Sequence, residues 1–218
     1  MKQKHILNIG MAKCGTSWLW KQLGQHPDVC LETLEKEPPY FLENNNFDEY
    51  KKYYQNLDIS ANFHVATWQV DQCLIQQLDQ VATHTTIMIS SPYLFIERFY
   101  NWLPKTLEIP DFVDMCIDTK QICYSDIVNR WIKNLSKSKF KILFYEDIVS
   151  EPAQFLSDYF KFCELRNVKI TGIETKVNEN QQPKTPVLFS SSQIKLINLE
   201  IKKFQSMVER NLTYWQKQ

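Results

Sequence analysis

Two of the four glycines in this 218-residue chain fall in one short loop, between an apolar run and a segment of helical character. Residues 5–9 are apolar enough to form a buried strand, and residues 16–23 have the pattern of a helix. Gly10 and Gly15 lie between them, where the chain must turn tightly. In such a unit the backbone N–H groups of the loop and the helix dipole converge on one point, a geometry that binds phosphate. We therefore predict a phosphate-binding strand–loop–helix unit over residues 5–23.

Further along the chain, apolar runs alternate with segments of helical spacing. Additional strands are predicted near residues 29–31, 57–60, 86–90 and 141–144, and helices near 67–80, 124–135, 152–163 and 192–209. This alternation predicts an α/β fold with a central, mostly parallel sheet of about five strands and helices on both faces. No linker marks a boundary, so residues 1–218 are expected to form a single domain.

The composition argues against a protein that binds nucleic acid through its overall charge. The chain has 25 Lys and Arg residues and 25 Asp and Glu residues, so its formal net charge is zero and a general affinity for nucleic acid is not expected. No apolar run reaches the roughly 18 residues of a transmembrane helix, and the first residues suit a strand better than a signal peptide. The six cysteines lack metal-binding spacing and are interpreted as free thiols in a reducing compartment. We expect a soluble cytoplasmic protein, compatible with a homodimer, with His5, His26 and His84 at the surface or at strand edges.

The loop from Gly10 to Ser17 has the glycine spacing of the nucleotide-triphosphate loop G-x-x-x-x-G-K-[ST]. Thr16 stands where that loop has its lysine, and the lysine is Lys13 instead. A lysine inside the loop can meet a bridging or leaving-group oxygen of a diphosphate-like anhydride. It cannot take the usual position at the β- and γ-phosphates. The pattern therefore disfavours an ATP-dependent kinase, which stays the alternative.

The pattern G-x-x-K-x-G-T-[ST]-W-L over residues 10–19 resembles the 5′-phosphosulfate loop of the sulfotransferases that use PAPS, 3′-phosphoadenosine 5′-phosphosulfate. The resemblance implies a three-layer, P-loop-like fold and a donor site that includes Lys13, Cys14, Gly15, Thr16, Ser17 and Trp18. Lys13 would also be catalytic, by neutralising charge on the departing phosphate oxygen. Cys14 is either a low-pKa thiol at the helix N-terminus or a small filler residue. Trp18 is the tryptophan that best suits stacking on adenine.

Residues 36–41, K-E-P-P-Y-F, are similar to the K-E-P-H-F-F segment of carbohydrate and bacterial sulfotransferases. The glutamate is assigned as the catalytic base in those relatives, so the resemblance implies that Glu37 accepts the proton of the acceptor. A surface acidic loop is the alternative reading of this stretch, and His64 is an alternative base. Ser60 and Asn62 are expected to line the acceptor cleft.

The family holds the 3′-phosphate of PAPS with a strand-end arginine and a serine eight residues later. At that spacing this chain has Ser90 and Arg98, so the pair is exchanged. We interpret Arg98 as the source of charge and Ser90 as the hydroxyl donor. A second alignment needs a three-residue insertion and puts Asn101 in place of the serine. A third reading makes Arg98 a solvated helix residue paired with a carboxylate.

Two further segments follow the family's order. Residues 145–147, Tyr-Glu-Asp, resemble a strand end that orients the phosphate loop, although an acidic strand end can also hold Mg²⁺. Lys184 lies between two prolines and either covers the nucleotide or is an ordinary exposed lysine.

Taken together, the resemblance implies a sulfotransferase that moves a sulfuryl group from PAPS to a hydroxyl or amine of an acceptor, giving PAP. The acceptor class it favours is a glycan or a hydroxylated metabolite. No metal is expected, because the loop and Lys13 supply positive potential. The alternatives are a P-loop ATP-dependent small-molecule kinase and a catalytically decayed PAP-binding relative whose 3′-phosphate site has lost its arginine at Ser90.

Overall fold

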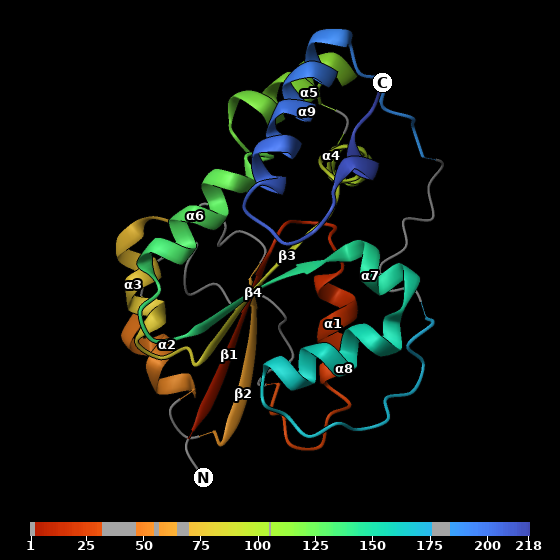
Figure 1. Cartoon of the computed structure of the whole chain (residues 1–218). Coiled ribbons are helices and arrows are strands. Elements are labelled where there is room, and N and C mark those ends of the chain that lie inside the picture. The colour runs from red at the N-terminus through yellow and green to blue at the C-terminus, as the bar shows by residue number, and fades with distance from the viewer. Residues whose placement is uncertain (1–2, 32–46, 55–56, 65–69, 105, 176–183) are drawn as a thin grey trace. The chain divides into compact units, whose positions relative to one another are not determined.

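The computed structural model describes residues 3–31, 47–54, 57–64, 70–104, 106–175 and 184–218. The chain divides into two compact units (Figure 1). The first unit comprises residues 1–89 and 131–178, and the second comprises residues 90–130 and 179–218. The described part of the first unit contains the sheet, and that of the second is helical.

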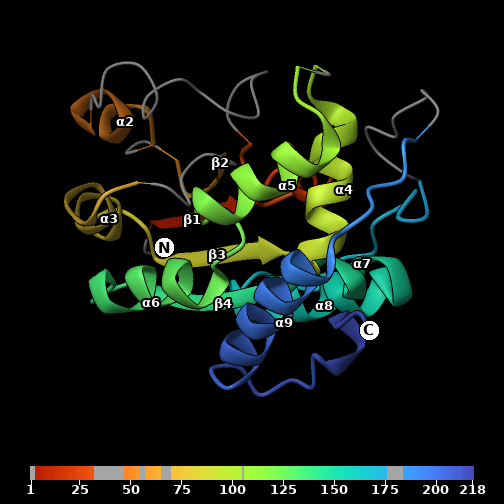
Figure 2. The ribbon, with the colours of Figure 1, turned by 90° about the horizontal axis from the view of Figure 1, so that it is seen from above.

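The first unit is built on a parallel sheet with the strand order β2-β1-β3-β4. Its strands are β1 (Lys4–Gly10), β2 (Ile59–His64), β3 (His84–Ile89) and β4 (Lys139–Phe144). Figure 2 shows β1, β3 and β4 side by side, and the register pairs Gly10 with Met88. The predicted α/β fold with a parallel sheet is confirmed. The segment near residues 29–31 was expected to be a strand, but it contributes a single bridge from Cys30 to Ser60.

Helices cover both faces of this sheet, with α1, α7 and α8 on one side and α2 and α3 on the other (Figure 1). Their bounds are α1 (Thr16–Leu23), α2 (Phe47–Tyr54), α3 (Gln72–Asp79), α7 (Tyr145–Ser150) and α8 (Pro152–Phe162). The second unit contains α4 (Pro92–Trp102), α5 (Ile109–Asp118), α9 (Ser191–Gln205) and the 3₁₀ helix η3 (Thr213–Trp215). Helix α6 (Tyr124–Asn134) continues from the second unit into the first. Among the described residues, no helix has the length and apolar character needed to span a membrane.

The core of the first unit explains why its strands are recognisable in the sequence. All six residues of β3 are buried, as are six of the seven in β1. A parallel strand with both faces covered is mostly apolar, and Ile6, Leu7 and Ile9 follow this pattern. The buried polar residues His5 and Asn8 interrupt it.

The three histidines expected at the surface or at strand edges are buried, so that expectation is wrong. His5 shows the reason, because both of its ring nitrogens have partners inside the core. Nδ1 lies 2.7 Å from Ser60 Oγ, and Nε2 lies 2.6 Å from the hydroxyl of Tyr50 in α2. Burial lowers the pKa of His5 to about 3, so its ring is neutral at physiological pH.

In the second unit, the end of the chain packs on α4 and α9. The Tyr93 hydroxyl on α4 donates to Asn198 Oδ1 on α9 at 2.9 Å. The ammonium of Lys217 lies 4.8 Å from the ring centre of Tyr93 and 4.5 Å from that of Phe189. Asn198 Nδ2 on α9 also donates to the carbonyl of Lys217 at 2.7 Å. The contacts of Lys217 therefore hold the residues after η3 against both helices.

A buried carboxylate fixes the turn that leads into β4. Asp79, at the end of α3, accepts hydrogen bonds from the amides of Ser136, Lys137 and Ser138 at 2.7–2.9 Å and from the Ser136 hydroxyl at 2.9 Å. Burial alone would raise its pKa, but these hydrogen bonds outweigh burial and hold the pKa below its usual value of 3.8.

We expect Asp79→Ala to lower the free energy of unfolding by about 1–3 kcal/mol at pH 7, because the amides of Ser136, Lys137 and Ser138 lose a charged acceptor. Urea unfolding measures this, and Asp118→Ala, at an exposed position, is the control. The folded-state pKa of Asp79 lies below its unfolded value, so its stabilisation is complete above pH 3.8 and is lost as the pH falls through the folded value. A difference between wild type and Asp79→Ala that stays constant down to pH 2 contradicts this assignment.

Candidate functional site

The loop between β1 and α1 is bent by two residues in the left-handed region, Lys13 with φ 61° and Gly15 with φ 94°. The amide of Met11 donates to the carbonyl of Met88 at 3.1 Å, which ties the loop to β3. Left-handed residues within a turn direct successive N–H groups into a concave anion-binding nest. The first N–H groups of any helix have no acceptor within the helix, and α1 has no acidic residue in its first turn. The loop therefore combines a nest with the positive end of a helix.

Both glycines of the loop are required by close packing. A Cβ at Gly10 would lie 2.7 Å from Thr16 Cγ2. A Cβ at Gly15 would lie 2.9 Å from Ile148 Cδ1 and 3.0 Å from Tyr145 Cδ2, both on α7. Helix α7 thus packs directly on the phosphate loop, which is the contact that a loop-orienting role for residues 145–147 requires.

The side chains of the predicted donor site differ in exposure. Cys14 and Thr16 are buried, and Lys13 and Ser17 are half-buried. Trp18 is only 6% exposed; its ring meets Phe155 edge-on, and its indole N–H donates to the carbonyl of Ile173 at 2.9 Å. Most of the Trp18 ring therefore faces protein, and its contact with adenine stays a prediction.

Residues 166–173 form a strap along α1 that sequence reasoning missed. The guanidinium of Arg166 donates to both carboxylate oxygens of Asp28 at 2.6 and 2.9 Å. The Gln25 carboxamide donates to the Thr171 carbonyl at 3.1 Å and accepts from the Thr171 hydroxyl at 3.0 Å. With the Trp18–Ile173 bond, the strap holds α1 near both of its ends. No local signal could have revealed it, because Gln25 and Thr171 are 146 residues apart.

A buried polar network lies in the sheet below the loop. Asn8 Oδ1 accepts from the hydroxyls of Thr86 and Tyr159, each at 2.7 Å. Asn8 Nδ2 donates to the carbonyl of Asn62 at 3.2 Å. One side chain thus joins β1, β2, β3 and α8, two residues before the loop begins.

Ser60 and Asn62 do not line an open cleft, so that expectation is wrong. Ser60 is fully buried and bonds to His5, and Asn62 is 3% exposed. Both lie on β2 beside β1, where the side chains are enclosed by the core.

The residues predicted to bind the 3′-phosphate belong to the second unit. Ser90 directly follows β3 and is fully buried, Arg98 is half-buried on α4, and Lys184 is exposed. Helix α4 begins at Pro92 with no acidic residue in its first turn, so its N-terminus is positive. Arg98 lies about 9 Å along the axis from Pro92, and helical side chains lean back toward the N-terminus.

Asn101, the residue of the second alignment, is bonded to the segment that carries Lys184. Its Nδ2 donates to the carbonyls of Glu97 and Thr185 at 2.8 and 2.9 Å, and its Oδ1 accepts from the Thr185 amide at 2.8 Å. The Asn101 carboxamide therefore fixes the neighbour of Lys184 on α4.

Glu37 falls outside the described residues, as does the side chain of His64, so the catalytic base stays a prediction. Across the part of the chain that the structure describes, no three His, Cys, Asp or Glu side chains are grouped so as to hold a metal ion.

Comparison with known proteins identifies the family. The family model of the sulfotransferase domain matches residues 3–206, so the chain belongs to the sulfotransferase domain family. This membership makes sulfuryl transfer the general chemistry of the protein.

Solved structures agree in fold. One is a sulfotransferase from Alicyclobacillus acidocaldarius, with a TM-score of 0.74 and 16% identity over 100% of both chains. Another is mouse sulfotransferase SULT7A1 complexed with PAP, with a TM-score of 0.62 and 14% identity over 96% of this chain and 86% of that one. No curated protein matches the chain by sequence.

The two left-handed glycines provide a matched test of the loop packing. Gly15→Ala is expected to lower the free energy of unfolding by about 2–4 kcal/mol, because backbone strain adds to a clash with α7. Gly172 also has a positive φ, 65°, but the nearest atom to an added Cβ is 3.6 Å away. Gly172→Ala should therefore cost only about 1 kcal/mol. Equal losses in urea unfolding would show that α7 does not constrain the loop.

Proposed function

We propose that residues 1–218 act as a single sulfotransferase domain that moves a sulfuryl group from PAPS to an acceptor. The observation that carries the proposal is the loop conformation: Lys13 and Gly15 are both left-handed at the positive end of α1. A loop of this shape suits a phosphate, and a lysine within it suits the bridging oxygen of a phosphosulfate rather than a γ-phosphate.

The chemistry follows from these positions. As the acceptor oxygen bonds to sulfur, the bond from sulfur to the phosphate oxygen of the donor breaks, and the electron pair stays on PAP. The amides of Gly15, Thr16 and Ser17 and the ammonium of Lys13 stabilise this developing charge. The side chain of Lys13 and the backbone of residues 14–18 hold the 5′-phosphate.

Ser90 and Arg98 are proposed to bind the 3′-phosphate, with Lys184 covering the nucleotide. The alternative alignment would put Asn101 in place of the serine that binds the 3′-phosphate. The hydrogen bonds of Asn101 favour Ser90 and Arg98 instead, because its carboxamide is engaged with Glu97 and Thr185. The positive N-terminus of α4 and the guanidinium of Arg98 supply the charge that a dianionic phosphate needs.

Glu37 is proposed as the base that takes the proton of the acceptor hydroxyl or amine. A carboxylate in a K-E-P-type segment suits a glycan or a hydroxylated metabolite as acceptor.

Calorimetric titration of PAP in EDTA tests the donor site. Lys13→Ala and Arg98→Ala should each weaken PAP binding about 10- to 100-fold, because each removes a charge-assisted hydrogen bond. The exposed lysines Lys21 on α1 and Lys202 on α9 give matched controls, and alanine at either should leave the affinity unchanged.

Other outcomes point to specific revisions. If Lys13→Ala weakens PAP binding and Arg98→Ala does not, the sulfotransferase chemistry stands. The assignment of Ser90 and Arg98 to the 3′-phosphate is then overturned. ATP binding that requires Mg²⁺, without PAP binding, favours the kinase. PAP binding without turnover over a panel of hydroxylated acceptors favours the decayed relative.

Glu37→Gln tests the base. With an acceptor that the wild type sulfates, we expect kcat to fall by about 10²- to 10⁴-fold, because the proton has no positioned acceptor. The affinity for PAP should be unchanged, and Glu35→Gln serves as the control in the same segment. Equal activities of Glu37→Gln and wild type would move the role to another residue, with His64→Gln as the next variant.

A further inference from the structure

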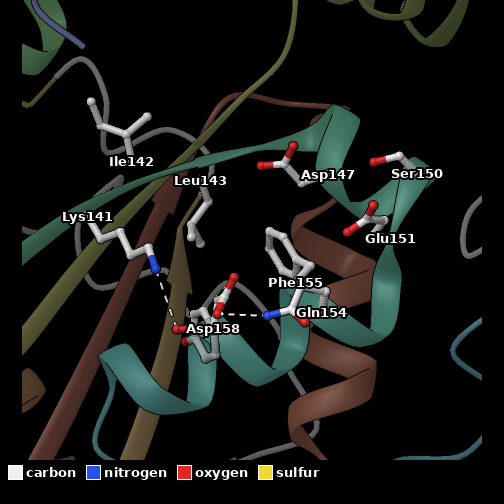
Figure 3. A pocket seen from close by; sticks show the side chains of 10 residues that line it. Lys141, Ile142, Leu143, Asp147, Ser150, Glu151, Gln154, Phe155 and Asp158 are labelled. Carbon is white, nitrogen blue, oxygen red and sulfur yellow. Dashed lines mark hydrogen bonds between the residues drawn. The ribbon is translucent and has the colours of Figure 1, made fainter. Parts of the chain in front are cut away.

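A surface groove of about 310 Å³ runs between β4 and helices α7 and α8 (Figure 3). Strand β4 is last in the sheet order, and among the described residues no strand pairs with its outer edge. The outer edge of a terminal strand presents backbone N–H and C=O groups that can pair with a further strand. The groove therefore lies beside a strand edge that, within the described part of the chain, has no further strand paired with it.

The groove has an apolar floor and an acidic rim. Leu143 on β4 and Phe155 on α8 form this floor, and they are 4% and 6% exposed. Figure 3 shows Asp147 and Glu151 at one end and Asp158 toward the other.

Lys141 is the basic residue of the lining, and it is directed along the groove toward α8. Its ammonium donates to the backbone carbonyl of Asp158 at 3.4 Å. The Asp158 carboxylate instead accepts from the Gln154 amide at 3.0 Å. Three carboxylates against one ammonium leave the lining with an excess of negative charge.

We propose that this groove binds an extended, lysine- or arginine-rich segment of another protein, which adds to β4 as a further strand. Backbone pairing with β4 would supply affinity, and alternate side chains of the added strand would reach the carboxylates of α7 and α8. The apolar floor would receive the aliphatic parts of the basic side chains. This proposal does not depend on the donor or the acceptor of the enzyme.

The charges argue against two other occupants. An acidic segment or a nucleic acid would meet the carboxylates of Asp147, Glu151 and Asp158. If this edge paired antiparallel with the same edge of a second copy, a register centred on Phe140 would place Lys139 of each copy opposite Lys141 of the other, which is unfavourable.

The test uses a fluorescein-labelled octapeptide that alternates lysine with valine, measured by fluorescence anisotropy with the full chain. It should bind at least about tenfold more tightly than a peptide that alternates glutamate with valine, and added salt should weaken it. Glu151→Lys and Asp158→Lys, both at exposed positions, should each weaken binding at least about tenfold. Asp118→Lys, exposed on α5, is the matched control and should have no effect.

Backbone pairing is tested by N-methylation of the peptide at its lysines or at its valines. Only alternate amides of an added strand face its neighbour, so one methylated peptide should lose binding and the other should retain it. If the two methylated peptides bind with equal affinity, charge attraction alone explains the binding, and the proposed pairing of an added strand with β4 is overturned. Equal binding of the acidic peptide, or sedimentation showing a dimer that Glu151→Lys dissociates, would overturn the proposed partner.

Discussion

The carboxamide of Asn8 is the interaction on which the first unit depends. It accepts hydroxyls from β3 and α8 and donates to the carbonyl of Asn62 in β2, all from a side chain that is 2% exposed. An apolar side chain in its place would leave the hydroxyls of Thr86 and Tyr159 buried without this acceptor. Because Asn8 lies two residues before Gly10, the network that fixes the sheet also fixes the base of the phosphate loop.

Strands were predictable where burial on both faces requires consecutive apolar residues, as at residues 6–7 in β1 and at residues 87–89 in β3. Helices α2, α4, α5 and α7 were not predicted, for local reasons. Pro92 follows the predicted strand at residues 86–90 and occupies the first turn of α4, where proline is favoured. Helix α7 begins at Tyr145, directly after β4 ends at Phe144. Because no turn lies between the two elements, no glycine or proline marks the boundary in the sequence. The burial of His5 depends on Tyr50 and Ser60, which no pattern around residue 5 reveals.

In the candidate site, too, the features formed by neighbouring residues could be predicted, and those formed by residues far apart in the sequence could not. The phosphate loop is a contiguous run, so its glycines, its lysine and its helix could be predicted together. The strap over α1 and the bond from Asn101 to Thr185 join residues 146 and 84 positions apart, and polar pairs at such separations leave no periodic signal. The roles of Glu37, Ser90 and Arg98 were assigned by resemblance, because neither periodicity nor burial distinguishes a phosphate ligand or a base from other polar residues.

The strap also sets when the loop can take its shape as the protein is made. Helix α1 is synthesised well before the residues that hold it, because Tyr159 and Ile173 follow their partners Asn8 and Trp18 by 151 and 155 residues. A nascent chain that ends before β4 carries the whole phosphate loop but neither α8 nor the strap that hold it. Parallel sheets built from such distant contacts fold slowly. The contacts that hold the phosphate loop are therefore completed only after about 155 further residues have been synthesised beyond Trp18.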